Sequence, residues 1–262
     1  MNRVDTAFVA ADEESRLLLA PYVTVGYPTS STALDLALAY TDEGVGMLEI
    51  GVPFSDPIAD GPTVQTASQI ALDGGTCLAD ALTLAAGVRS RSNIPILVMG
   101  YANPFLRYGI DVLASDLAAA GVDGLIVPDI LPEHSGEFES ACVAHGLHMI
   151  RFVAPTTAKA RLATIGSGAR GFVYCVSVTG VTGSRSELAD SLPTYLGHVK
   201  QAMDVPRVVG FGISKPDHVR TIKRIAEGAI VASALIDIVS RNGPKTRVTA
   251  AAAHVRQLLA AT

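Results

Sequence analysis

The sequence lacks features that mark disulfide-stabilised, secreted and membrane proteins. It contains no tryptophan, three cysteines and 17% charged residues in 262 positions. Cys77, Cys142 and Cys175 are an odd number without metal-ligand spacing, which fits a reducing compartment better than a disulfide framework. The N-terminus lacks the basic-then-apolar order of a secretory signal, and no uninterrupted apolar run is long enough to span a bilayer. We therefore expect a cytoplasmic protein without a membrane-spanning segment.

The charged residues also argue against several functions. The net charge of -5 disfavours sequence-independent binding of nucleic acid, which needs a basic face. The six histidines show no metal-ligand spacing with acids or cysteines, so we expect no metal site. No lysine lies in the interior of an expected strand, where a Schiff-base enzyme would need one. Neither a phosphate-loop motif nor a dinucleotide fingerprint is present, which makes a nucleotide ligand less favoured.

Short apolar runs alternate with amphipathic segments along the whole chain. The hydrophobic content of 49% provides ample material for a core. The short runs are continuously apolar, as expected for parallel strands that are covered on both faces. Helices are predicted between the strands, one more before the first strand and two after the last, and residues 100–104 are predicted to be a loop. Strands are predicted at residues 17–25, 47–50, 95–99, 122–127, 147–153, 171–178, 207–211 and 229–232.

Eight strands that alternate with helices favour a closed (β/α)8 barrel, the TIM-barrel fold of the α/β class. We predict a single barrel domain over residues 1–262, with an extra N-terminal helix and extra helices near an expected phosphate site. An open doubly wound sheet is the alternative. Active sites of such barrels lie at the C-terminal ends of the strands. The polar residues at those ends are Glu49, Asp60, Tyr101, Asp129 and Tyr174.

Residues 47–62 are the most informative stretch of the chain. A short apolar strand carries Glu49, and the loop after it carries Asp56 and Asp60. Burial without a partner raises the pKa of an acid, and catalytic acids are often made in this way. Two carboxyl groups in different environments can divide the roles of acid and base. The alternative is that Glu49 pairs inside the core while Asp56 and Asp60 only shape turns.

The loops after the last two strands have the composition of a phosphate site. Gly212 and Ser233 follow these strands, and Gly183 lies in the loop after the preceding strand. A phosphate needs several backbone N–H donors at close range, which glycine and a helix N-terminus supply. Alternatively, the glycines make turns, and Ser214 and Ser233 are helix caps. Their joint position in a barrel favours a phosphorylated ligand.

Residues 48–62 resemble the signature of the tryptophan synthase alpha chain family, and the resemblance covers nearly the whole chain. Further matching segments follow in the expected order at residues 22–28, 99–104, 127–129, 180–183 and 210–214. The resemblance implies a (β/α)8 barrel that cleaves indole-3-glycerol phosphate to indole and glyceraldehyde 3-phosphate. It also implies pairing with a beta chain in an alpha2-beta2 complex, with the cofactor pyridoxal phosphate in the beta chain and no cofactor in this one.

The resemblance implies a role for each matching residue. Glu49 resembles the general acid and base, and Asp60 the partner of the indole N–H. Substrate would be bound by Tyr101 and by the bulky neighbours of an indole ring, Tyr22, Leu125, Tyr174 and Phe211. Phosphate would lie against Gly183, Gly212, Ala232 and Ser233, with Thr182 closing its loop over Asp60. The interface with the beta chain would include Pro53, Phe54, Asp56 and Asn103.

Three positions depart from the pattern of the family. Ala232 stands where the family usually has glycine before Ser233, and Gly100 and Leu131 are unusual in their motifs. None of these changes removes a catalytic group. Two other functions stay open at this point: a protein that mainly binds and activates a beta chain, and a different phosphate-binding barrel such as an isomerase.

Overall fold

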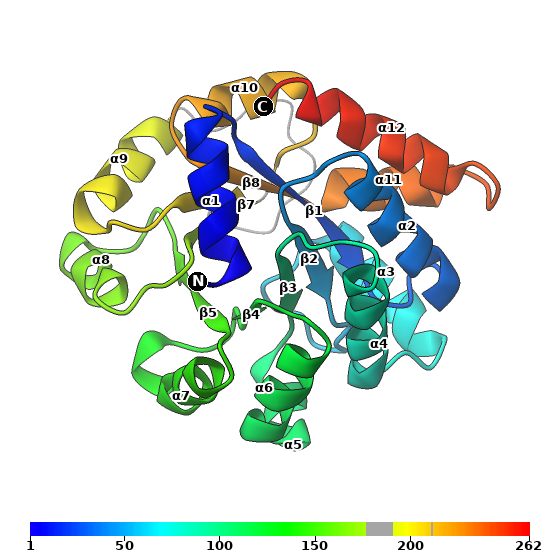
Figure 1. The fold of residues 1–262 in the computed structure, drawn as a ribbon, viewed down its shortest axis with the longest axis horizontal. Coiled ribbons are helices and arrows are strands. Elements are labelled where there is room, and N and C mark those ends of the chain that lie inside the picture. The colour runs from blue at the N-terminus through cyan, green and yellow to red at the C-terminus, as the bar shows by residue number, and fades with distance from the viewer. Residues whose placement is uncertain (177–190, 211) are drawn as a thin grey trace.

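Eight parallel strands close into one barrel in the computed structural model, which describes residues 1–176, 191–210 and 212–262 (Figure 1). The strand order around the barrel is the order along the chain, with β8 paired to β1. Closure excludes the open doubly wound sheet. The strands are β1 (Leu18–Thr24), β2 (Leu48–Gly51), β3 (Ile96–Met99), β4 (Gly124–Ile126), β5 (His148–Val153), β6 (Val173–Val176), β7 (Arg207–Gly210) and β8 (Gly228–Val231).

Helices surround the barrel and carry the chain from each strand to the next (Figure 1). Before β4 they are α1 (Arg3–Glu13), α2 (Ser30–Asp42), α3 (Pro62–Asp73), α4 (Leu78–Arg89), α5 (Ala102–Tyr108) and α6 (Ile110–Ala119). After β4 they are the 3-10 turn η1 (Pro132–His134), α7 (Gly136–Ala144), α8 (Lys159–Gly166), α9 (Leu192–Ala202), α10 (Pro216–Lys223), α11 (Ser233–Arg241) and α12 (Arg247–Leu259). Among the described residues no single helix is long and apolar enough to cross a membrane, and the only pair that qualifies together, α3 with α4, is bent by 103°.

The strand register decides which residues line the inside of the barrel. Tyr22 pairs with Glu49, Glu49 with Leu97, and Leu97 with Gly124. Paired residues of neighbouring parallel strands point to the same face, and side chains alternate faces along each strand. The pairing continues from Gly124 to His148 and from Phe152 to Tyr174, and His148 and Phe152 share a face of β5, so Tyr174 lies on the same face as Glu49. Glu49 and Tyr174 therefore both point into the barrel, while their sequence neighbours pack outward against the helices.

Helix α1 lies across the N-terminal end of the barrel (Figure 1). Asn2 caps its first turn by accepting a hydrogen bond from the Val4 N–H at 2.9 Å. Phe8 packs against Phe172, which directly precedes β6, with 5.9 Å between the ring centroids. These contacts confirm the expected extra N-terminal helix and show that it covers the end of the barrel opposite the strand termini where the site is expected.

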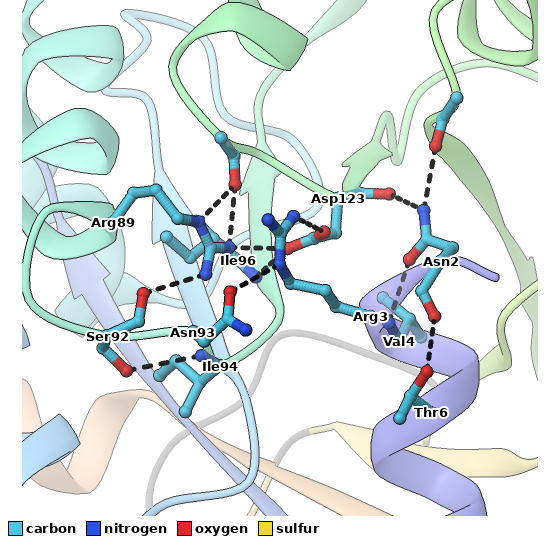
Figure 2. A network of polar contacts seen from close by, with 12 residues as sticks. Asn2, Arg3, Val4, Thr6, Arg89, Ser92, Asn93, Ile94, Ile96 and Asp123 are labelled. Atoms are coloured by element: carbon cyan, nitrogen blue, oxygen red, sulfur yellow. Dashed lines mark hydrogen bonds and ion pairs between the residues drawn. The ribbon is translucent and has the colours of Figure 1, made fainter.

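Asp123 is the centre of a polar network at this same end of the barrel (Figure 2). Its buried carboxylate accepts hydrogen bonds from Arg3 at 2.9 Å, from Arg89 at 2.8 Å and from the Ile96 N–H at 2.9 Å. Asn2 donates a further bond to the Asp123 carbonyl at 2.8 Å. One carboxylate thus joins α1, α4 and the start of β3 to the residue that precedes β4.

The prediction of a loop at residues 100–104 is wrong, because α5 begins at Ala102. Pro104 lies in the first turn of the helix, where the missing N–H would have no intrahelical partner in any case. The Ala102 N–H donates to both oxygens of Asp129, at 2.9 and 3.2 Å. An aspartate from the next loop therefore caps the N-terminus of α5, a contact that lies outside the local sequence.

Replacing Asp123 with alanine is expected to lower the free energy of unfolding by about 3 kcal/mol, because the partly buried Arg89 cation loses its buried carboxylate partner. Urea unfolding followed by circular dichroism measures the change. Asp111→Ala is the matched control, because the Asp111 side chain is 82% exposed and its loss is expected to cost less than about 0.5 kcal/mol. Equal effects of the two substitutions would contradict a central role for Asp123.

Candidate active site

Glu49 lies at the inner face of β2 and is 1% exposed. Its Oε2 atom has no hydrogen-bond partner among the described residues. Burial, followed by the nearby charge of Asp60, raises the pKa of Glu49 to about 8. At neutral pH the folded protein therefore holds Glu49 mainly in its protonated form.

Asp60 lies in the loop after β2 and is fixed by Tyr101, the residue that precedes α5. The Tyr101 hydroxyl donates to Asp60 Oδ2 at 2.9 Å and accepts the Ala59 N–H at 3.1 Å. Burial raises the pKa of Asp60 to about 6, and the hydrogen bond from Tyr101 acts in the opposite direction. At neutral pH Asp60 is therefore mainly an anion while Glu49 is mainly neutral.

Two buried tyrosines complete the inner wall, and glycines make room for them. A side chain at Gly51 would overlap the Tyr22 hydroxyl, and one at Gly210 would overlap the ring and hydroxyl of Tyr174. Burial raises the pKa of both phenols, and the charges of Asp60 and Glu49 raise it further. Tyr174 also stacks on Phe152, with 4.7 Å between the ring centroids. The two phenols stay protonated and can act only as neutral, amphipathic wall groups.

The register contradicts the expectation that Leu125 faces an indole ring inside the barrel. Leu125 pairs with Val98, whereas Ile126 pairs with Met99, which in turn pairs with Gly51 on the inner face. Leu125 therefore points outward, toward the helices, and Ile126 is the inward residue of β4. The sequence could not show which of the two points inward, because both are apolar residues in a strand that is covered on both faces.

The structure describes part of the expected phosphate site. Gly212 has a φ of +80°, a conformation that favours glycine, and Ser233 is the first residue of α11. Ala232 has a φ of -116°, which any residue adopts, so glycine is not required by the backbone at that position. The Leu235 N–H already donates to the Ala232 carbonyl at 3.0 Å, which leaves the N–H groups of Ser233 and Ala234 in the first turn of α11 to face an anion. Thr182, Gly183 and Phe211 lie outside the described residues.

The four positions expected at a partner interface differ in exposure. Pro53 is buried, Phe54 is half-buried, and Asp56 and Asn103 are exposed. Phe54 stacks on Tyr101, with 5.1 Å between the ring centroids. The phenol that holds Asp60 is thus in direct contact with a residue of the expected interface.

Gly100 and Leu131 are the other two departures from the family pattern. A side chain at Gly100 would overlap the ring of Phe105, which is fully buried in α5, so glycine here permits that packing. Leu131 is 56% exposed in the loop after β4.

Within the described ranges, no three metal-ligating side chains lie together. A closed (β/α)8 barrel with two acids of separated pKa at its C-terminal mouth has the arrangement of an enzyme that moves protons.

Comparison with known proteins gives one consistent result. The sequence model of the family described as tryptophan synthase alpha chain matches residues 8–262. Tryptophan synthase alpha chains of Roseiflexus castenholzii and Chloroflexus aggregans are 50% and 47% identical, over 98% and 100% of this chain and 99% and 98% of theirs. A structure of Mycobacterium tuberculosis tryptophan synthase is 36% identical with a TM-score of 0.91, covering 99% of this chain and 98% of that one. Tryptophan synthase subunit alpha from Legionella pneumophila is 30% identical with a TM-score of 0.91, covering 100% and 98%.

The chain belongs to the tryptophan synthase alpha chain family. It is a lyase, and its reaction is the cleavage of indole-3-glycerol phosphate to indole and glyceraldehyde 3-phosphate in tryptophan biosynthesis. The family pairs with a beta chain, and in the known complex pyridoxal phosphate belongs to that beta chain. The alternative of an unrelated phosphate-binding isomerase is thereby excluded.

The raised pKa of Glu49 predicts a pH-dependent stability. The pKa of about 8 in the folded state exceeds the value of about 4.3 in an unfolded chain, so between these values only the folded state keeps the proton. The stability from that proton is fully present below about pH 4 and is lost as the pH rises through about 8, at no more than about 1.4 kcal/mol per pH unit. Glu49→Gln is expected to flatten this loss in urea unfolding at pH 5, 7 and 9. Glu137→Gln, at an exposed position, is the control and is expected to keep the wild-type slope of unfolding free energy against pH. The same slope in Glu49→Gln would contradict a buried proton on Glu49.

Proposed function

We propose that Glu49 and Asp60 are the catalytic residues of the cleavage. The observation that carries this proposal is the pair of pKa values, about 8 for Glu49 and about 6 for Asp60, at the same mouth of the barrel. A neutral acid and an anion then coexist at neutral pH without a bound metal or a change of conformation. This separation is what a reaction needs when it both protonates one carbon and stabilises positive charge on a neighbouring nitrogen.

The proposed reaction starts with protonation of the ring carbon that bears the glyceryl chain. Glu49 delivers its proton to that carbon, and the ring nitrogen acquires positive charge, which the Asp60 anion stabilises through the indole N–H. The Glu49 carboxylate then accepts the proton of the hydroxyl on the attached chain carbon. The bond between the ring and the chain breaks, its electron pair restores the aromatic ring, and indole and the aldehyde product leave with Glu49 protonated again.

Backbone groups at the opposite side of the mouth are proposed to hold the phosphate. Gly212 and Ser233 follow β7 and β8, and the first turn of α11 directs its free N–H groups and the positive end of its dipole toward the mouth. Ala232 is compatible with this role, because it directly precedes the first residue of α11 and its negative φ does not require glycine. Tyr22 and Tyr174 are proposed to pack against the indole ring.

The beta chain is proposed to dock on the mouth of the barrel. Three large apolar side chains are exposed there: Ile58 is 82% exposed, Leu106 54% and Leu131 56%. They follow β2, β3 and β4, so they lie at the same edge as Phe54 and Asp56. Exposed apolar groups beside charged ones are typical of an interface with another protein. The assembly would be an alpha2-beta2 complex with pyridoxal phosphate only in the beta chains, and activation of the beta chain is a second role of the same surface.

Two further expectations are part of the proposal. We infer that residues 1–262 form one domain, since the barrel uses strands from Leu18 to Val231 and α12 packs back against α2 and α11. The protein is proposed to act in the cytoplasm, in keeping with its three unpaired cysteines.

Indole release by the purified chain tests the catalytic assignment, measured with and without a beta chain. Glu49→Gln and Asp60→Asn are each expected to lower kcat by about a hundredfold or more, because one removes the proton donor and the other the stabilising anion. Asp42→Asn, at an exposed position of α2, serves as the control with unchanged activity. Circular dichroism establishes that each variant is folded. Either variant keeping more than about a tenth of the activity would remove that residue from the mechanism.

Tyr101→Phe tests whether the phenol positions Asp60. The substitution keeps the ring on Phe54 and removes both hydrogen bonds, so kcat is expected to fall by about tenfold with little change in KM. Because the lost hydrogen bond holds the pKa of Asp60 down, the acidic limb of the pH profile of kcat is expected to move to higher pH. A lower kcat with an unmoved acidic limb would show that Tyr101 acts only on the fold.

A further inference from the structure

A cavity of about 340 Å³ lies at the mouth of the barrel, where Ala59, the neighbour of Asp60, forms part of its wall. Its inner wall is formed by Met99, Phe152 and Tyr174, and by Ala59, the neighbour of Asp60. Its outer wall includes Leu131, in the loop after β4, and residues of α8, beyond the end of β5. The cavity, here called the side chamber, therefore runs from the inside of the barrel into the layer between the sheet and the helices.

The polar groups of the side chamber already have partners. Arg161 donates to Glu133 at 2.7 and 2.9 Å, and Arg151 donates to Glu139 at 2.7 Å. The Thr157 hydroxyl accepts the Ala154 N–H at 3.0 Å. The remaining lining is almost entirely aliphatic or aromatic. The side chamber thus presents no free charge to an occupant and favours an uncharged, apolar group.

The side chamber lies on the side of the mouth opposite the proposed phosphate groups. Gly212 and Ser233 follow β7 and β8, whereas Met99, Phe152 and Tyr174 belong to β3, β5 and β6. In a closed barrel of eight strands, β8 and β4 lie across from each other. A substrate with its phosphate at Ser233 and its ring N–H at Asp60 would extend its benzo ring across the mouth, toward the strands whose residues line the side chamber.

The volume exceeds what that ring requires. A dry apolar cavity of about 150 Å³ holds benzene. The side chamber has about 340 Å³, so space remains beyond the benzo ring in the direction of Leu131 and Ile165. An unfilled apolar space next to a substrate gains van der Waals contacts when an apolar substituent occupies it.

We propose that the enzyme also cleaves indole-3-glycerol phosphates that carry a small apolar substituent at ring position 5 or 6, with the substituent held in the side chamber. This inference rests on the proposed placement of Glu49, Asp60 and the phosphate groups. The specificity-determining residues are then those of the chamber wall, Met99, Phe152, Leu131 and Ile165 among them, and not the catalytic pair.

The test compares kcat/KM for the unsubstituted substrate and for its 5-chloro and 6-chloro derivatives. We expect at least one derivative to stay within about threefold of the unsubstituted substrate, because its chlorine enters existing space. A 4-chloro derivative, substituted next to the glyceryl chain and away from the chamber, is expected to fall by more than about tenfold. Loss of more than about tenfold for both the 5-chloro and the 6-chloro derivative would overturn the proposal.

A chamber variant assigns the tolerance to this cavity. Ala154→Leu adds bulk to the lining, so the ratio of kcat/KM for the preferred chloro derivative to that for the unsubstituted substrate is expected to fall by at least about tenfold. Ala39→Leu, at a half-buried position of α2 away from the mouth, is the matched control and is expected to keep the ratio. An unchanged ratio in Ala154→Leu would overturn the assignment. If the unchanged protein cleaves the unsubstituted substrate but neither the 5-chloro nor the 6-chloro derivative, this inference fails while the proposed function stands. If it cleaves none of them, the proposed function itself fails.

Discussion

The burial of one carboxyl group, that of Glu49, is the constraint on which the rest of the site depends. The Glu49 carboxyl, buried on the inner face of the barrel, is shielded from the solvent that would stabilise its charge, so it stays mainly protonated near neutral pH. The second acid must then be kept ionised by other means. The phenol of Tyr101 supplies a hydrogen bond to Asp60, and Gly51 leaves the space that the Tyr22 hydroxyl occupies beside them. The separation of an acid from an anion is thus a property of the barrel interior.

The two ends of the barrel divide stability from chemistry. At the N-terminal end, Asp123 satisfies two arginines and a backbone N–H, and α1 packs over it (Figure 2). At the C-terminal end, Glu49 Oε2 has no partner among the described residues and Ile58 is exposed. The Asp123 carboxylate thus has partners for both of its oxygens where α1 covers the barrel, whereas Glu49 Oε2 is left available where a substrate can pair with it.

Strand positions could be predicted closely, because a parallel strand covered on both faces is a short apolar run. For the same reason, the sequence did not show which side chains point into the barrel and which point toward the helices. Leu125 and Ile126 are equally apolar, and only the pairing of Ile126 with Met99 shows which of them points inward. The helix Ala102–Tyr108 was missed because Pro104 reads locally as a loop residue, and the carboxylate that caps the helix comes from Asp129, in the next loop.

The sequence by itself determined the barrel, the family and the candidacy of Glu49 and Asp60, because these follow from local patterns: the order of apolar runs, and acids within and directly after one of them. Only the tertiary structure decided how the acids differ. The hydroxyl of Tyr101 reaches Asp60 from 41 residues away, and closure of the barrel, rather than any local preference, brings the two together. The side chamber likewise exists only because the end of β5, η1 and α8 meet in space, since a cavity is a property of surfaces that no single segment encodes.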